Sequence, residues 1–140
     1  QHCENAEKVV NFLKKHKEVT KVIYSTEHEK KIADRAKQYL KGGNGPMVGI
    51  ELKGGIEAGK KFIESLKMFY HVANIGDARS LAIHPASTTH SQLNEKELAA
   101  SGVTQSYVRL CIGIEHIDDI IDDLDQALNK SSKGNLKAVS

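Results

Sequence analysis

Hydrophobic residues recur every three or four positions in four segments of the chain, and this spacing predicts amphipathic helices. The four expected helices cover residues 1–16, 26–40, 56–69 and 117–128. A fifth helix of one or two turns is expected where Asn94 and Glu97 form a cap pair, with Gly102 ending it. The first helix has no capping residue before its periodic run, which indicates that the chain was cut from a longer one.

The second helix has the clearest start signal. Thr26 and Glu29 match the capping-box pattern, and the glycine-rich segment 42–46 ends the helix. We therefore expect one side of this helix to be buried. The expected buried stripe consists of Ile32, Ala33, Ala36, Tyr39 and Leu40.

Short runs of β-branched and aromatic residues fill the gaps between the helices and predict strands. The expected extended segments are residues 20–24, 47–52, 71–75 and 80–84, and a run that starts at Ser106. Gly76 and Asp77 mark a turn between the third and fourth segments. Helices that alternate with strands favour a mixed α/β fold of the α+β type, in which a layer of helices covers one face of a sheet.

The length and charge limit the class of protein. The 140 residues suffice for one domain, expected at residues 1–130 and followed by a polar tail at 131–140. Twenty basic and eighteen acidic residues are too balanced to indicate a nucleic acid or a membrane surface as the partner. Cys3 and Cys111 form no paired motif, and no membrane span or secretory signal is recognised, so we expect reduced thiols and a cytoplasmic location.

Three candidate sites have ordinary explanations. Residues 54–60 match G-x-x-x-x-G-K, but Lys61 replaces the Ser or Thr of a phosphate loop, so a strand-to-helix turn is favoured over a nucleotide site. His71, His84 and His90 lack the spacing of metal ligands, and no metal is expected. The aspartates at 118, 119, 122, 123 and 125 lack the pattern of a calcium loop and are expected on a solvated helix face.

Arg109 interrupts the last predicted strand, where Val108 and Leu110 face one side and Tyr107 and Arg109 the other. An arginine in mid-sheet needs an acidic partner, because it cannot lose its charge. The pattern alone favours a structural ion pair. The alternative is that the guanidinium binds a ligand carboxylate. The polar stretch 71–90 is interpreted as a surface connection.

Several separated segments resemble one known family. They are A-N-I-G-D-A-R-S-L, H-P-A-S-T-T-H, L-A-A-S-G-V and V-R-L-C-I-G-I-E-H, in this order. The chain is similar, from His2 to about Leu128, to the C-terminal part of the pyridoxal-phosphate enzymes of cysteine and methionine metabolism. The resemblance implies the small C-terminal domain of a type I fold, a large cofactor-binding domain as its partner, and a homotetramer.

The resemblance also implies roles for particular residues. Arg109 matches the arginine that grips the substrate's α-carboxylate, Asn74 matches a position that assists it, and Thr89 matches a position near the cofactor's lysine. The implied reaction converts O-acetyl-L-homoserine and sulfide to homocysteine and acetate. The motif of the cofactor lysine is missing, so we expect no catalytic residue in this chain and no activity from it alone.

Three alternatives remain open at this stage. The chain could come from a methionine γ-lyase or a cystathionine γ-synthase of the same family, or could be a non-catalytic assembly module that pairs with a separate large-domain chain. Many family members have Pro-Gly-Leu where this chain has Ser25-Thr26-Glu27. This difference affects the expected geometry of that loop but not the fold.

Overall fold

Helices and strands alternate along the computed structural model, which describes residues 1–92 and 94–132. The helices are α1 (His2–Leu13), α2 (Lys30–Tyr39), α3 (Gly55–Ser65), α4 (Glu95–Ala100) and α5 (Ile117–Ser132), with a 3₁₀ turn η1 (Pro85–Ser87). The strands are β1 (Val19–Ile23), β2 (Met47–Leu52), β3 (Tyr70–His71), β4 (Leu81–Ile83) and β5 (Tyr107–Cys111). The mixed α/β fold expected from the sequence is confirmed.

The described strands form a single sheet in the order β1-β2-β5-β4-β3. The pairs β1–β2, β2–β5 and β5–β4 are antiparallel, whereas β3 and β4 are parallel. The turn at Gly76 and Asp77 therefore does not form a tight hairpin, because a parallel pair needs a connection that returns to the same end of the sheet. Strand β5 lies at the centre, so its side chains face both sides of the sheet.

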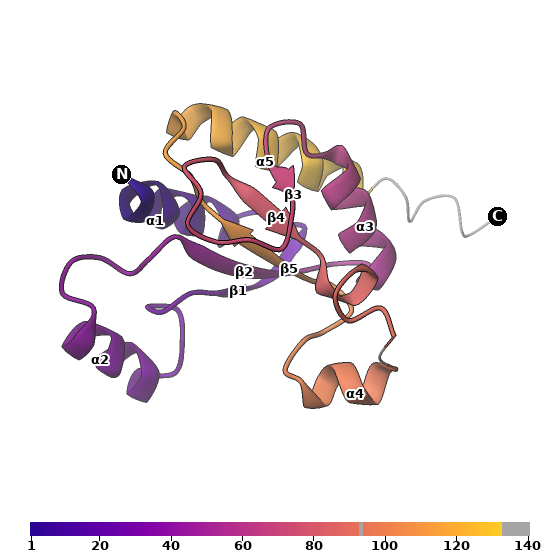
Figure 1. Ribbon diagram of the computed structural model, residues 1–140, viewed down its shortest axis with the longest axis horizontal. Helices are drawn as coiled ribbons and strands as arrows, with labels where there is room; N and C mark the ends of the chain where they lie inside the picture. Colours follow the sequence, from indigo (N-terminus) through magenta and orange to yellow (C-terminus); the bar gives the residue numbers. More distant parts are fainter. Residues whose placement is uncertain (93, 133–140) are drawn as a thin grey trace.

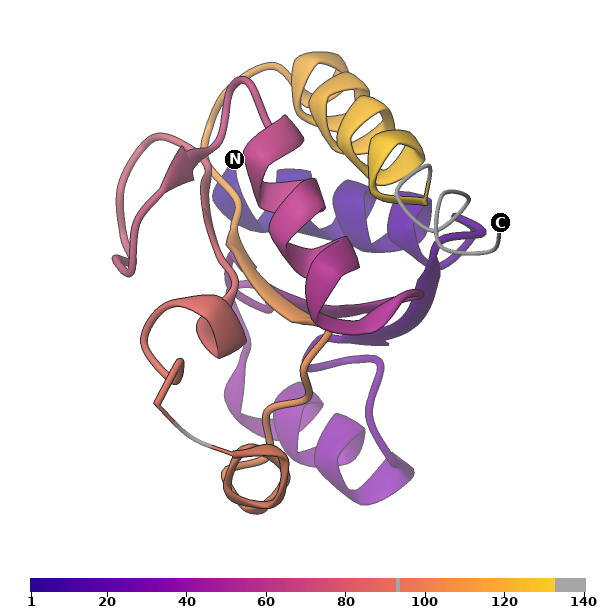
Figure 2. The same ribbon diagram turned by 90° about the vertical axis from the view of Figure 1, so that its right-hand side faces the viewer.

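One face of the sheet carries the hydrophobic core. Helices α1, α3 and α5 cover this face, as both views show (Figures 1 and 2). Alternate residues of β2 and β5 point into the core, because side chains of a strand alternate between its faces. The fully buried core residues include Leu13, Val48, Ile50, Phe62, Val108, Leu110, Ile120 and Leu124.

The opposite face of the sheet carries Tyr107 and Arg109, as the alternation in the sequence predicts. Helices α2 and α4 project on this side, away from the layer of α1, α3 and α5 (Figure 1). Both helices are joined to the sheet by irregular segments. The second face is therefore less covered than the core face, and it is the face on which the candidate site lies.

The prediction that α2 buries one stripe of residues is wrong. No residue of α2 is buried, and Ile32, Tyr39 and Leu40 are exposed by 45%, 69% and 44%. The expected capping box is also wrong, because α2 begins after Glu29 with no side-chain capping bond. The hydrophobic residues of α2 do have helical spacing, but the helix lies on the side of the sheet opposite to the core.

Two other helix ends differ from the expected ones. Helix α3 ends at Ser65 rather than Phe69, because Leu66 turns to an extended backbone and leads the chain towards β3. Helix α5 continues to Ser132, past the expected Leu128, and residues 133–140 of the predicted tail lie outside the described residues.

The short helix α4 has the cap that the sequence predicts. The side-chain oxygen of Asn94 accepts hydrogen bonds from the backbone amides of Lys96 and Glu97, both at 3.0 Å. The Glu97 carboxylate accepts from the Asn94 amide at 2.9 Å. This reciprocal pattern is the capping box, which stabilises the first turn by pairing amides that have no partner within the helix.

Candidate functional site

Arg109 lies in the middle of the central strand, on the less covered face of the sheet. Its neighbours in register are Gly49 on β2 and Ile83 on β4. The residue is half-buried. Strand pairing on both sides fixes its backbone, so the position of the guanidinium depends only on the direction that the side chain takes across the face.

The guanidinium of Arg109 crosses β4 and reaches the loop that follows β3. Its Nη2 atom donates a hydrogen bond to the backbone carbonyl of Asn74 at 3.3 Å. No Asp or Glu forms an ion pair with Arg109 among the side chains that the structure describes. The structural ion pair favoured by the sequence pattern is therefore not found in this part of the chain. Most of the guanidinium donors remain available to an anionic ligand.

Asn74 contacts Arg109 through its backbone rather than through its amide side chain. The side-chain oxygen of Asn74 accepts a hydrogen bond from the amide of the next residue, Ile75, at 2.9 Å, so this side chain is engaged locally while the backbone carbonyl contacts the guanidinium. The structure thus brings together two of the three residues that the sequence singled out.

The loop that holds Asn74 is braced on its return to β4. Arg79 pairs with Asp77 at 3.0 Å and lies over the Tyr70 ring, 4.2 Å from the ring centre. The hydrogen bonds from Arg79 lower the pKa of Asp77 to about 2. At the end of the loop, the Ser80 hydroxyl donates to the Glu115 carboxylate at 2.9 Å. These contacts connect the Asn74 loop to β3 and to the start of α5.

Thr89 lies apart from this pair. It follows η1, is exposed, and its hydroxyl bonds to Nδ1 of His90 at 2.9 Å. The segment before Thr89 is more firmly held, because the Thr88 hydroxyl donates to the His84 carbonyl at 2.9 Å. Within this chain, Thr89 is thus a surface residue whose neighbour is a histidine and not Arg109.

His84 is a buried structural residue. Its Nε2 lies 2.7 Å from the Gln105 carbonyl and its Nδ1 lies 2.8 Å from the Ser87 hydroxyl. Since a carbonyl only accepts, Nε2 carries the proton and Nδ1 accepts from Ser87. Burial lowers the pKa of His84, which keeps the ring neutral. Both ring nitrogens are occupied. No group of three potential metal ligands occurs among the described residues.

The buried ring of His84 is expected to make the protein less stable in mild acid. The unfolded chain protonates His84 near pH 6.5, whereas the folded chain resists protonation. The contribution of the neutral ring is therefore complete above pH 6.5 and is lost as the pH falls below it, by at most about 1.4 kcal/mol per pH unit. Urea unfolding at pH 7.5 and 5.5 should show a larger loss for the wild type than for His84→Gln. The exposed His28→Gln serves as the control, and it should behave like the wild type.

Gly59 has a packing reason to be glycine. A Cβ atom at this position would collide with the imidazole ring of His84, at 2.6 Å from Cδ2. Gly59 lies inside α3, where alanine normally stabilises a helix by about 0.5–1 kcal/mol. The glycine of the apparent phosphate-loop motif is thus explained by the helix packing on His84.

Gly59→Ala is expected to lower the free energy of unfolding by about 1–3 kcal/mol, because the ring is overpacked and has no space to move. Urea unfolding measures the change. Gly42→Ala is the matched control, since a Cβ at Gly42 meets nothing within 4 Å. A gain in stability for Gly59→Ala would contradict the packing of His84 on α3.

The remainder of the G-x-x-x-x-G-K motif also favours an ordinary turn. Gly54 and Gly55 have φ angles of +96° and +65°, which lead β2 into α3. The Lys60 ammonium pairs with the Glu57 carboxylate at 2.9 Å on the exposed side of α3. A carboxylate in the first turn would repel a phosphate, so these residues do not fit the phosphate of pyridoxal phosphate. This turn is therefore not expected to bind the cofactor phosphate.

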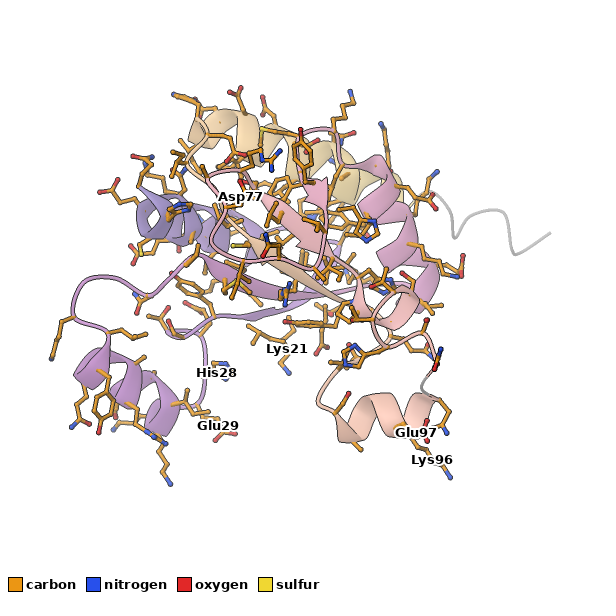
Figure 3. The ribbon with its side chains drawn as sticks, in the orientation of Figure 1. Lys21, His28, Glu29, Asp77, Lys96 and Glu97 are labelled. Carbon is orange, nitrogen blue, oxygen red and sulfur yellow. The ribbon has the colours of Figure 1, made fainter. Side chains whose placement is uncertain are left out.

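The sequence interpretation missed a groove on the Arg109 face. It has a volume of about 230 Å³ and extends from Arg109 towards β1. Figure 3 shows His28 and Lys21 on this side of the sheet, the side to which α2 projects. The lining residues are Ile23, Tyr24, Ser25, His28, Met47, Val48, Gly49, Tyr107 and Arg109. Two features of the sequence indicate this groove. Tyr107 lies two residues before Arg109 and so on the same face of the strand, and Gly49 is a glycine inside a strand.

The five aspartates of α5 do not share one solvated face, and the prediction is wrong for Asp123. Asp123 is only 6% exposed, and its carboxylate accepts hydrogen bonds from the amides of Lys67 and Met68 at 2.9 and 2.8 Å. Asp118, Asp119 and Asp122 are exposed as expected. Asp123 thus holds the turn after α3.

Both cysteines are free thiols, Cys3 half-buried and Cys111 buried. Among the described residues, no helix has the length and hydrophobicity needed to cross a bilayer.

Comparison with known proteins agrees with the fold and with the motifs. A sequence model of the Cys/Met metabolism PLP-dependent enzymes matches residues 1–129. The O-acetyl-L-homoserine sulfhydrylase of Leptospira meyeri is 50% identical over 91% of this chain, which spans 29% of that protein. An L-methionine gamma-lyase of Fusobacterium nucleatum subsp. polymorphum is 43% identical over 93% of the chain and 33% of its own length.

Solved structures give the same result. An O-acetylhomoserine (thiol)-lyase of Campylobacter jejuni, with N′-pyridoxyl-lysine-5′-monophosphate, superposes with a TM-score of 0.82 at 42% identity. The alignment covers 91% of this chain and 30% of that one. A cystathionine gamma synthase of Xanthomonas oryzae gives 0.81 at 31% identity, over 94% and 34% of the two chains. The chain spans about a third of the length of these relatives and, since the family match extends over residues 1–129, it belongs to the pyridoxal-phosphate-dependent enzymes of cysteine and methionine metabolism.

Proposed function

We propose that residues 1–130 are the small C-terminal domain of a cytoplasmic, homotetrameric O-acetyl-L-homoserine sulfhydrylase. The reaction is γ-replacement, in which sulfide displaces acetate from O-acetyl-L-homoserine and gives homocysteine for methionine biosynthesis. The observation that carries the substrate-binding part of this proposal is Arg109, whose half-buried guanidinium has no carboxylate partner among the described side chains. The identity of 50% with a sulfhydrylase supports this choice within the family.

In this proposal, Arg109 binds the α-carboxylate of the amino-acid substrate. A guanidinium offers two parallel donors that match the two oxygens of a carboxylate, so the substrate is oriented as well as held. The Asn74 carbonyl accepts one guanidinium hydrogen bond at 3.3 Å and so helps to orient the fork. Orientation of the substrate lowers the entropic part of the barrier, which is the contribution that this domain makes to catalysis.

The cofactor belongs to the part of the enzyme outside this chain. Pyridoxal phosphate supplies an electron sink for the reaction when it is bound. The large domain would provide the lysine that holds the cofactor, and Thr89 would lie near that lysine in the assembled enzyme. The exposure of Thr89 is consistent with a position at an interface between domains. The chain alone would be inactive.

A second candidate is γ-elimination from methionine, favoured by an identity of 43% with an L-methionine gamma-lyase. A cystathionine γ-synthase is supported by the structural match to the Xanthomonas oryzae enzyme. The same arginine would hold the carboxylate of the substrate in each case, so this domain does not discriminate between them. A non-catalytic assembly module remains the alternative from a different class.

The test uses the complete enzyme, purified with its cofactor. We expect homocysteine from O-acetyl-L-homoserine and sulfide at a kcat/KM at least 100-fold above that for cystathionine formation with cysteine or for release of methanethiol from methionine. Faster methanethiol release would identify a lyase, and faster cystathionine formation a γ-synthase. A native product of 140 residues with no large domain in the same polypeptide would support the assembly module.

A further inference from the structure

Tyr107 and Arg109 lie on the same face of β5, and the strand next to them has no side chain at the corresponding position. Gly49 of β2 is directly opposite Arg109. The Tyr107 ring covers this glycine, which is buried as a result. A Cβ atom at residue 49 would lie 2.7 Å from Cε2 of Tyr107 and 2.9 Å from its hydroxyl oxygen. The ring therefore fits on β2 only because residue 49 is glycine.

The side chain of Arg109 has two directions available across the sheet. Towards β4 it passes Ile83 and reaches the Asn74 carbonyl, as observed. Towards β2 it would pass Gly49 and enter the groove of about 230 Å³ that Tyr107 and Arg109 both line. A long side chain opposite a glycine would normally be free to occupy this space. The Tyr107 ring lies against Gly49 at the edge of this groove and so narrows the second direction.

Charge gives a further reason for this arrangement. Burial raises the pKa of the Tyr107 phenol, so the ring stays neutral beside the cationic guanidinium. A neutral aromatic ring restricts the guanidinium by its volume and does not neutralise it. The positive charge remains available for a carboxylate, which an acidic residue at this position would prevent.

We propose that Tyr107, seated on Gly49, is a positioning residue that directs the Arg109 guanidinium towards Asn74 and keeps it out of the groove beside β2. The proposal rests on the proposed role of Arg109 in carboxylate binding. Neither the Tyr107 ring nor Gly49 binds a carboxylate itself. Both act through the position of Arg109.

The test compares four variants of the complete holoenzyme, Tyr107→Ala, Tyr107→Phe, Gly49→Ala and the double variant Tyr107→Ala/Gly49→Ala. The dissociation constant of L-alanine, followed by the absorbance of the bound cofactor, measures carboxylate binding for any member of the family. We expect Tyr107→Ala to weaken binding by about 5- to 20-fold and to raise KM for O-acetyl-L-homoserine equally, with kcat changed less than 3-fold. Tyr107→Phe keeps the ring and should restore most of the affinity.

The Gly49→Ala variants test the proposal independently. Gly49→Ala should displace the ring and weaken L-alanine binding, whereas Gly49→Ala made in the Tyr107→Ala background should add little, because no ring remains to be displaced. Gly42→Ala is the matched control. Equal affinity in Tyr107→Ala and the wild type would overturn the proposal, as would additive effects in the double variant. If Arg109→Lys also leaves the affinity unchanged, the role of Arg109 itself is wrong, so the two failures are distinguishable.

Discussion

Arg109→Lys in the complete enzyme is expected to raise KM for the amino-acid substrate by about 10- to 100-fold. Lysine keeps the charge but loses the planar fork, so one of two charge-assisted hydrogen bonds to the carboxylate is lost, each worth about 1.5–3 kcal/mol. Among the described residues, the Arg109 side chain makes a single hydrogen bond, of 3.3 Å to the Asn74 carbonyl. The free energy of unfolding should therefore change by less than about 1 kcal/mol. Steady-state kinetics and urea unfolding measure the two quantities.

The matched control is Arg35→Lys, the same substitution on the exposed helix α2. It should leave both KM and stability unchanged. An analogue of the substrate that lacks the carboxylate gives a second comparison, because its affinity should be equal in the wild type and in Arg109→Lys. Unchanged KM in Arg109→Lys would rule out the carboxylate clamp, whereas a large loss of stability would indicate that Arg109 is mainly a structural residue.

Local patterns in the sequence predict the positions of most strands and of the three helices on the core face, but neither the strand order nor the short length of β3. The alternation in strand β5 predicts both of its faces, one apolar and one with Tyr107 and Arg109, although Cys111 on the second face is buried. Helix α5 was predicted from Ile120 and Leu124, which are fully buried. Such elements are predictable because their periodicity is set by the backbone geometry alone.

The errors arose where distant parts of the chain decide the environment. The stripe of α2 has the same spacing as a core helix, but the loops on both sides carry it away from the core, and Tyr39 is 69% exposed. The ion pair expected for Arg109 required knowledge of its neighbours, and these proved to be Gly49, Ile83 and the Asn74 carbonyl. No local pattern contains this information.

Gly59, and the glycine beneath Tyr107, show a second limit of what a sequence can predict. Glycine in a helix or a strand signals a close approach of some other group, but the sequence does not say of which. In α3 the group is the His84 ring, and in β2 it is the Tyr107 ring. The first contact explains a motif that looked like a phosphate loop, and the second sets the surroundings of the candidate carboxylate-binding residue.

Asp123 is a buried charged residue whose replacement should cost more stability than Gly59→Ala. Its carboxylate accepts hydrogen bonds from the backbone amides of Lys67, Met68 and Phe69 at 2.9, 2.8 and 3.4 Å, and the residue is 6% exposed. Removing the carboxylate leaves these amides without their partner in a part-buried turn. Each unsatisfied buried group costs about 1–3 kcal/mol. We therefore expect Asp123→Ala to lower the free energy of unfolding by about 3–5 kcal/mol, as measured by urea unfolding.

The neighbouring Asp122→Ala provides the control, because Asp122 is exposed on the same turn of α5 and its replacement should change stability by less than about 0.5 kcal/mol. Asp123→Asn should fall between the two, since its amide oxygen still accepts but carries no charge. Equal losses for Asp122→Ala and Asp123→Ala would contradict the anchoring role. The position of Asp123 was recognisable in principle, because it lies three residues after Ile120 and four before Ala127, both fully buried. A carboxylate on the apolar stripe of a helix must bind something, and here it binds the segment that leads into β3 and the Asn74 loop.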